Sequence, residues 1–238
     1  MTYPMDSPKK SVGIYVVNFM DEERRQRMTN RFKSLGLDCH FIHPVTTEDP
    51  RIKQDMIPFY KRAWAILFQH VDSVRQFYET TTFDYCIVCE DDIHISRQLK
   101  EELPKAIELF ESAKLDILLL SYLWPYSVHE SNHHFPLKGE ANGFKLHGYP
   151  NDLWGAHMYM VSRDHAKRMM DRFTKEYAEV QCDPTPFCSD WQITKFGERA
   201  LLVPMIGVEE GGTKCDHEGQ NQFHESCFRF NYTAERFI

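Results

Sequence analysis

The sequence predicts an α/β fold in which a mostly parallel central sheet is flanked by helices. Apolar runs of strand length alternate with stretches of helical periodicity along most of the chain, and this order favours right-handed crossovers between parallel strands. Two runs, within residues 83–93 and 115–122, are almost continuously apolar. Such runs are typical of strands that are buried on both faces of a sheet.

The N-terminal third predicts two strands and two helices. Residues 11–19 form an apolar first strand. Residues 21–36 follow as a charged helix with acids in its first turn and a glycine at its end. Residues 38–43 return as a second strand. Residues 57–79 place large apolar side chains at i, i+3, i+4 and i+7 spacing, which predicts a long helix with a broad buried face.

The remaining elements follow the strand at 83–93. We expect helices at 98–112, 164–177 and 189–196, and strands at 115–122, 154–162 and 200–204. Between residues 123 and 149 the periodicity is lost among Pro, Gly, Asn and His, which indicates a long loop or a small hairpin. No repeat or linker marks a second domain. We therefore expect one domain over residues 1–238, with a core at about 11–205 and an irregular C-terminal tail at 206–238.

Composition argues against several classes of protein. The 238 residues include 28 Lys and Arg against 35 Asp and Glu, a formal net charge of −7, so nucleic acid is not expected as the main partner. No stretch approaches the roughly 18 apolar residues of a membrane helix, and the N-terminus lacks the apolar segment of a signal peptide. Seven cysteines without a disulfide-type spacing are consistent with reduced thiols. We expect a cytoplasmic protein with no membrane span.

Three adjacent carboxylates, Glu90, Asp91 and Asp92, end the apolar strand. They repel one another and favour a counter-cation, and open α/β sheets place their ligands at the carboxyl ends of strands. Oxygen ligands suit Mg²⁺ or Mn²⁺, which keep open positions for substrate phosphates, so the motif indicates a bound nucleotide diphosphate. Glu90 and Asp92 share one side of an extended strand, so one can hold the metal while the other contacts ribose or a metal-bound water. The alternative is a polar strand exit with solvated acids.

Several separated motifs resemble those of family-25 glycosyltransferases, the lipopolysaccharide and collagen sugar transferases. The motifs are a first strand with Asn18 followed by Arg24 and Arg25, the acidic run ending at Asp92, a G-x-x-x-Y-x-x-S strand at 155–162, and Ser189-Asp190-Trp191. The similarity spans about residues 12–205. It implies a GT-A-type, Rossmann-like fold in which Asp92 is the direct ligand of the catalytic metal.

The expected nucleotide contacts are Asn18, Arg24, Glu90 and Asp91. Asn18 and Arg24 follow the first strand, where a nucleotide would meet the edge of the sheet, and a guanidinium can hold a phosphate with two hydrogen bonds. The alternative for the arginines is an exposed helix surface with partners such as Asp21.

Asp190 is the candidate catalytic base. As a base, its carboxylate would take the proton of an acceptor hydroxyl. As a plain cap, it would accept a hydrogen bond from a helix amide. Trp191 and Trp154 can form an apolar platform for a sugar ring, although packing in the core is the more frequent use of a tryptophan.

The C-terminal histidines and cysteines allow two interpretations. In many GT-A enzymes a C-terminal histidine completes the coordination of the metal, and His217 is the candidate here. Alternatively, Cys215, His217, His224 and Cys227 offer four ligands for a tetrahedral zinc site. The two interpretations exclude each other for His217.

Together these features predict a metal-dependent glycosyltransferase. It would move a sugar from a nucleotide-sugar, most simply a UDP-sugar, to a hydroxyl on a glycan or protein. Mn²⁺ or Mg²⁺, held by Asp92, Glu90 and His217, would neutralise charge on the departing diphosphate. The resemblance implies inversion at the anomeric carbon, with Asp190 as base; a retaining outcome is the alternative. The alternatives are a non-catalytic glycan- or nucleotide-binding relative and a zinc-stabilised interaction domain.

Overall fold

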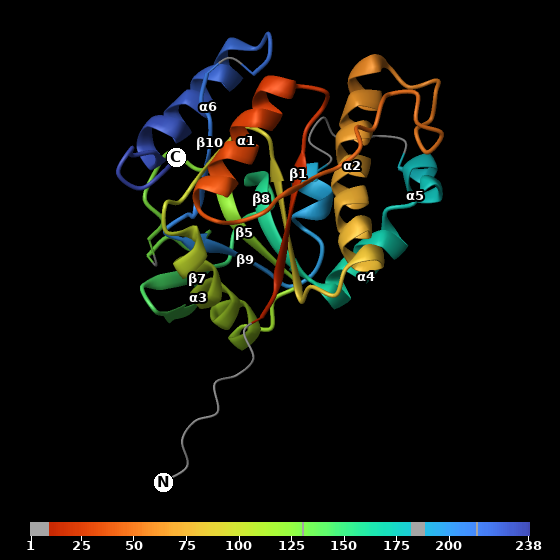
Figure 1. The fold of residues 1–238 in the computed structure, drawn as a ribbon. Helices are drawn as coiled ribbons and strands as arrows, with labels where there is room; N and C mark the ends of the chain where they lie inside the picture. Colours follow the sequence, from red (N-terminus) through yellow and green to blue (C-terminus); the bar gives the residue numbers. More distant parts are fainter. Residues whose placement is uncertain (1–9, 130, 182–188, 213) are drawn as a thin grey trace.

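The computed structural model describes residues 10–129, 131–181, 189–212 and 214–238. A central eight-stranded sheet has the order β2-β1-β3-β8-β5-β9-β7-β6, and a two-stranded sheet pairs β10 with β4. Helices cover the large sheet on both sides (Figure 1). The α/β class and the mostly parallel sheet predicted from the sequence are therefore confirmed.

The strands have the following bounds: β1 Val12–Val17, β2 His40–Phe41, β3 Tyr85–Glu90, β4 Ile93–Ile95, β5 Ile117–Leu123, β6 Leu137–Ala141, β7 Phe144–His147, β8 Trp154–Ser162, β9 Arg199–Val203 and β10 Gly207–Glu209. In the large sheet, β8 pairs antiparallel with both β3 and β5, and β7 pairs antiparallel with β9 and β6. The other neighbours, β1 with β2 and β3 and β5 with β9, are parallel. Only β8 and β7 therefore run against the common direction of this sheet.

The helices are α1 Glu22–Ser34, α2 Pro58–Thr80, α3 Leu99–Ser112, α4 Arg163–Arg172, α5 Lys175–Val180 and α6 Glu218–Asn231, with a short π-helix, η1, at Ser189–Ile193. Two buried clusters fill the two faces of the sheet. One packs α2, α4 and α5 against residues such as Val88 and Leu119. The other packs α1 and α3 against residues such as Ile87 and Leu118. Neighbouring residues of β3 and β5 thus point into different cores, as the two-residue period of a strand requires.

Three local expectations need correction or refinement. The tail expected to be irregular contains β10 and the long helix α6. Periodicity over 207–209 is too short to read, and α6 carries many polar residues, so neither element gave a clear apolar pattern. The helix expected at 164–177 is divided into α4 and α5 at Phe173 and Thr174. The undecided region 123–149 contains the β6-β7 hairpin.

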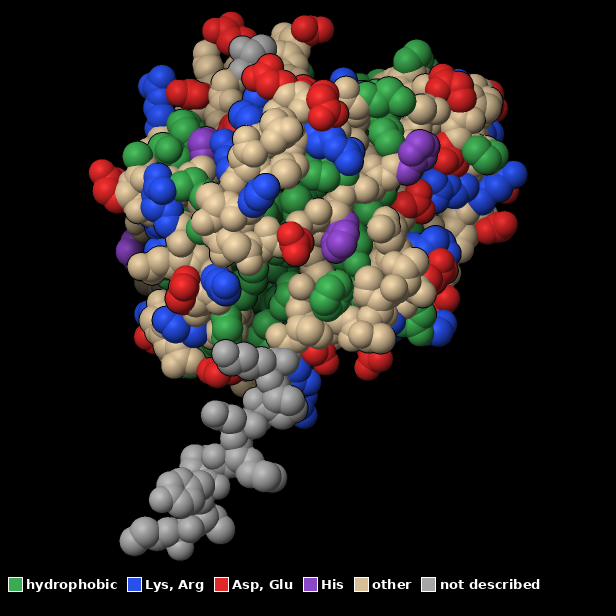
Figure 2. Space-filling model, viewed as in Figure 1, with side chains coloured by type: hydrophobic (Ala, Val, Ile, Leu, Met, Phe, Trp, Pro, Cys, Tyr) green, Lys and Arg blue, Asp and Glu red, His purple; other side chains and the backbone are tan. Residues whose placement is uncertain are grey.

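The surface of the molecule carries charges of both signs. Acidic and basic side chains are interspersed over the face drawn in Figure 2, and the wider areas between them are uncharged. Among the described residues, no helix is both long and apolar enough to cross a membrane.

Candidate functional site

A cavity of about 900 Å³ opens at the carboxyl ends of β1 and β3. Its walls come from β1, α1, the start of α2, the end of β3, β8, β10 and α6. Charged and titratable side chains dominate one wall: Arg24, Glu90, Asp91, Asp92, His157, Glu209, Lys214 and His224. Parallel neighbours such as β1 and β3 end at the same edge of the sheet, which is why segments far apart in sequence meet here.

Asp91 is held from the first strand and the first helix. The Asn18 side-chain amide donates to one Asp91 oxygen at 2.6 Å, and the Arg24 guanidinium donates to the other at 2.9 Å. The Gln69 side chain donates to the Asn18 carbonyl at 2.9 Å and so holds the backbone that follows β1. Burial raises the pKa of Asp91 in spite of the opposing bonds from Arg24 and Asn18. The structure thus brings together the three residues Asn18, Arg24 and Asp91, which the sequence placed at the nucleotide.

Asp92 is buried between two cations. Lys214 Nζ lies 2.8 Å from Asp92 Oδ2, and Arg24 lies 3.5 Å from the same oxygen. Burial works against ionisation, but the charge and hydrogen bond of Lys214, together with His157 and Arg24, outweigh it and hold the pKa of Asp92 below its usual value. Asp92 Oδ1 is also buried and has no hydrogen-bond partner within the described part of the chain. One oxygen of Asp92 is therefore neutralised, and the other is buried with its hydrogen-bonding capacity unused by the described residues.

Lys214 joins Asp92 to a second carboxylate. Its ammonium lies 3.0 Å from Glu209 Oε1, and both side chains are mostly buried, with 15% and 3% of their surface exposed. Burial favours the neutral amine, but Asp92 and Glu209 together raise the pKa of Lys214. The ammonium is therefore charged and fixed between the end of β3 and the end of β10.

Glu209 also orients a histidine of α6. His224 Nδ1 lies 3.0 and 3.1 Å from the two Glu209 oxygens, while its Nε2 is buried without a hydrogen-bond partner among the described residues. His157 of β8 lies nearby, with its ring centroid 6.5 Å from that of His224. Burial lowers the pKa of His157, but nearby carboxylates, foremost Glu90 and Glu209, outweigh this and raise it. The cavity wall thus combines carboxylates with two histidines, His157 and His224.

Glu90 faces α2 at the edge of this group. His70 Nε2 lies 3.6 Å from Glu90 Oε1, and its Nδ1 lies 3.1 Å from the Tyr159 hydroxyl. His70 is fully buried, so the pair connects the cavity to the core beneath α2. Glu90 lines the cavity as expected.

Asp190 serves a role that the sequence did not show. Its Oδ1 accepts hydrogen bonds from the backbone amides of Gly155 at 2.7 Å and Ala156 at 2.9 Å. These amides belong to β8, so the carboxylate ties η1 to the start of that strand instead of capping its own helix. Asp190 also contributes to the raised pKa of His157, which places its charge near the site. Oδ2 takes no part in these two bonds.

His217 lies apart from the acids. It is the N-cap of α6, where Nδ1 accepts a hydrogen bond from the Gln220 amide at 3.2 Å. Within the ranges that the structure describes, no three His, Cys, Asp or Glu side chains are placed to share a metal ion. Neither the expected set of Asp92, Glu90 and His217 nor the cysteine and histidine zinc set is assembled there.

The donor set does not fit a divalent cation as it is arranged. Mg²⁺ needs carboxylate oxygens at about 2.0–2.1 Å in a nearly octahedral shell. Asp92 Oδ2 and Glu209 Oε1 are instead both held by the Lys214 ammonium, whose charge would repel a metal.

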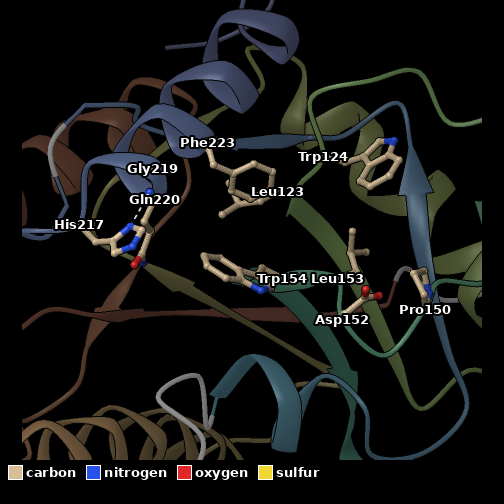
Figure 3. A pocket seen from close by; sticks show the side chains of 10 residues that line it. All are labelled: Leu123, Trp124, Pro150, Asp152, Leu153, Trp154, His217, Gly219, Gln220 and Phe223. Carbon is tan, nitrogen blue, oxygen red and sulfur yellow. Dashed lines mark hydrogen bonds between the residues drawn. The ribbon is translucent and has the colours of Figure 1, made fainter.

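A second cavity, of about 580 Å³, lies beside the first. Its walls include Trp124, Leu153, Trp154, His217 and Phe223, and Gln220 lines both cavities. The rings of Trp154 and Phe223 (Figure 3) meet edge to face at 5.7 Å. Trp154 also lies 5.9 Å from the ring of His224. An aromatic cavity thus adjoins a charged one, with α6 between them.

Sequence reasoning missed Lys214 and His157 as site residues. Lys214 is a lone lysine in a segment without periodicity, and no signal marked it. His157 lies inside the strand motif at 155–162 that was recognised for other residues. A sequence pattern does indicate Glu209 as a site residue, because Glu209 and Glu210 follow an apolar run just as the acids at 90–92 do.

No family model matches the chain, and no curated protein matches it in sequence. Solved structures give distant likenesses. A glycosyltransferase involved in glycosylation of the major capsid of PBCV-1 has a TM-score of 0.46 at 11% identity, covering 92% of this chain and 99% of that one. A197 from STIV has a TM-score of 0.40 at 7% identity, covering 80% and 81%.

Mannose-1-phosphate geranyltransferase from Thermus thermophilus has a TM-score of 0.35 at 10% identity, covering 79% of this chain and 57% of that one. Scores and identities of this size do not establish a common activity.

Proposed function

We propose that this chain transfers a sugar from a nucleotide-sugar, with UDP-sugars the first to test, to a hydroxyl on a glycan or protein. The observation that carries the proposal is the pair of adjoining cavities. One is lined by acids and their cations at the carboxyl ends of β1 and β3, and the other is lined by aromatic rings. This pairing suits a donor diphosphate next to an acceptor sugar, because phosphates need charge and sugar faces pack on rings.

The donor would occupy the charged cavity. Arg24 and Lys214 are the cations nearest the acids of β3, and both can donate to phosphate oxygens. The Oδ1 of Asp92, which is buried and has no partner among the described residues, would accept a hydrogen bond from a hydroxyl of the ribose or of the sugar. These groups would hold the donor and offset the charge that grows on the diphosphate as it leaves.

The acceptor would approach from the aromatic cavity. Its hydroxyl oxygen forms the new bond to the anomeric carbon, while the bond from that carbon to the diphosphate oxygen breaks and the diphosphate leaves with the electron pair. The hydroxyl proton passes to a base. A single displacement of this kind inverts the anomeric carbon.

Two side chains suit the role of base. Asp190 has one carboxylate oxygen that the amides of β8 do not use. His224 is oriented by Glu209 through Nδ1, which leaves Nε2 for the proton, and its ring lies beside Trp154 at the junction of the cavities. A carboxylate that orients the base is a common feature of proton transfer in enzymes.

Release of nucleoside diphosphate from a panel of nucleotide-sugars tests the proposal. Purified protein would be incubated with UDP-, GDP-, ADP- and CDP-linked sugars, with and without a glycan mixture, and the products separated by chromatography. We expect one donor to be hydrolysed slowly alone and faster with glycans. A protein that binds a nucleotide-sugar tightly and never cleaves it would instead be a non-catalytic binding relative.

A further inference from the structure

Lys214 occupies the position between Asp92 and Glu209 that a bridging metal ion would need. Its ammonium lies 2.8 Å from Asp92 and 3.0 Å from Glu209. These carboxylates come from the ends of β3 and β10, and their side chains are only 9% and 3% exposed. We propose that Lys214 is the resident cation of this site, and that nucleoside diphosphates bind here without a divalent ion. The inference rests on the proposed function.

The hydrogen-bonding capacity of Lys214 supports this role. An ammonium group has three donors and no acceptor. Asp92 and Glu209 take two of the three donors. The third can reach a phosphate oxygen without breaking either ion pair, so Lys214 can bridge the acids and a ligand as a metal ion would.

Arg24 supplies a second cation, which contacts the same oxygen of Asp92 as Lys214 does. It contacts Asp91 at 2.9 Å and Asp92 at 3.5 Å from α1, whereas Lys214 arrives from the segment before α6. Asp92 is thus flanked by positive charge from two distant parts of the chain. A diphosphate placed against this pair would meet fixed positive charges that need no metal to balance them.

Binding of nucleoside diphosphates with and without chelator tests the inference directly. The probes are UDP, GDP, ADP and CDP, and the measurement is isothermal titration calorimetry on the wild-type protein in EDTA or in MnCl₂. We expect one probe to bind with affinities that agree within about twofold between the two conditions. Binding that appears only with Mn²⁺ overturns the inference and leaves the proposed function standing. Binding by none of the four probes in either condition overturns both.

Variants at position 214 add a gain-of-function test. Lys214→Ala should weaken the binding of the same probe in EDTA by about tenfold or more, the usual effect of losing one charge-assisted hydrogen bond. The variant leaves Asp92 and Glu209 without their shared cation, so it should also bind Mn²⁺, detected as loss of the free-ion signal in electron paramagnetic resonance. The wild-type protein should show no such loss.

Two further variants serve as controls. Lys214→Arg keeps the charge and should bind the probe in EDTA better than Lys214→Ala. Lys167→Ala removes an exposed lysine of α4 that pairs with Asp171, and it should match the wild-type protein in every assay. Circular dichroism checks that each variant is folded. A Lys214→Ala protein that is folded and binds the probe in EDTA as well as wild type refutes the role of Lys214, and the wild-type EDTA experiment decides the matter even if that variant does not fold.

Discussion

The charged cavity and the aromatic cavity adjoin at Gln220, yet they depend on the sequence in different ways. The charged cavity needs opposite charges from distant segments to meet, as when Arg24 and Lys214 reach Asp91 and Asp92 across 67 and 122 positions. The aromatic cavity needs only that a few rings, such as those of Trp154 and Phe223, be left partly uncovered. Substitutions should therefore disrupt the first cavity strongly and the second mildly.

The largest effect is expected for Asp92→Ala. The change removes the oxygen that Lys214 and Arg24 share, so the cations lose their alignment toward a diphosphate. We expect transfer to fall by about a hundredfold or more. The melting temperature should also fall, since a mostly buried ammonium loses one of its two partners. Asp171→Ala, which removes an exposed acid of α4, is the control; full activity in Asp92→Ala would remove Asp92 from the site.

Asp190→Asn tests the candidate base that is bonded to the start of β8. The amide oxygen of Asn can still accept the hydrogen bonds from Gly155 and Ala156, so stability should hardly change. If Asp190 is the base, transfer should fall by about a hundredfold while donor binding survives. His224→Gln is the matched variant. Wild-type turnover in Asp190→Asn, together with a large loss in His224→Gln, would assign the proton transfer to the histidine.

A smaller effect is expected in the aromatic cavity. Trp154→Ala removes a ring that packs against Phe223 and His224, and one aromatic contact is worth about 0.5–1.5 kcal/mol. The KM for an acceptor glycan found in the screen should rise several-fold, with the affinity for UDP unchanged. Trp154→Phe should retain most of the wild-type KM. Equal weakening of UDP binding would show that the cavities are not independent.

The sequence predicted the parts of this molecule that depend on local pattern. Periodicity gave the class of the fold and most of the long elements, and β8 was located almost to the residue. Its antiparallel placement between β3 and β5 was not predictable, because both directions bury the same apolar run.

The sequence revealed the acids of the site and did not reveal which cations pair with them. The sequence shows residues 90–92 as three adjacent acids, which repel one another and therefore favour binding of a cation. In the structure, Asp91 forms an ion pair with Arg24 and Asp92 forms one with Lys214, while Glu90 lies near His70. Acids can be recognised as neighbours in the chain, whereas their partners are set by tertiary folding. The metal expected at Asp92 therefore stays a prediction, to be decided against the role proposed for Lys214.

The smallest effect compares two buried histidines by their response to pH. Carboxylates around His157 outweigh its burial and raise its pKa above the ordinary 6.5, while burial lowers the pKa of His165, on α4, to about 4. His157 therefore stabilises the fold in its protonated form below about pH 6.5, and this contribution is lost as the pH rises through its folded pKa. The contribution of His165 to stability changes with pH in the opposite direction. Between about pH 6.5 and 4 the unfolded chain binds a proton at this residue and the folded chain does not, so stability falls as the pH falls.

Urea unfolding of His157→Gln and His165→Gln from about pH 5 to 8.5 measures both signs. The wild-type advantage over His157→Gln should shrink with rising pH by on the order of 1 kcal/mol, the usual scale for one titrating group. The wild-type advantage over His165→Gln should instead grow as the pH rises from about 5 to 6.5. Parallel curves for the two variants would mean that the carboxylates of the charged cavity do not act on His157. The surroundings of His157 and of His165 would then not differ in their effect on the pKa of a buried histidine.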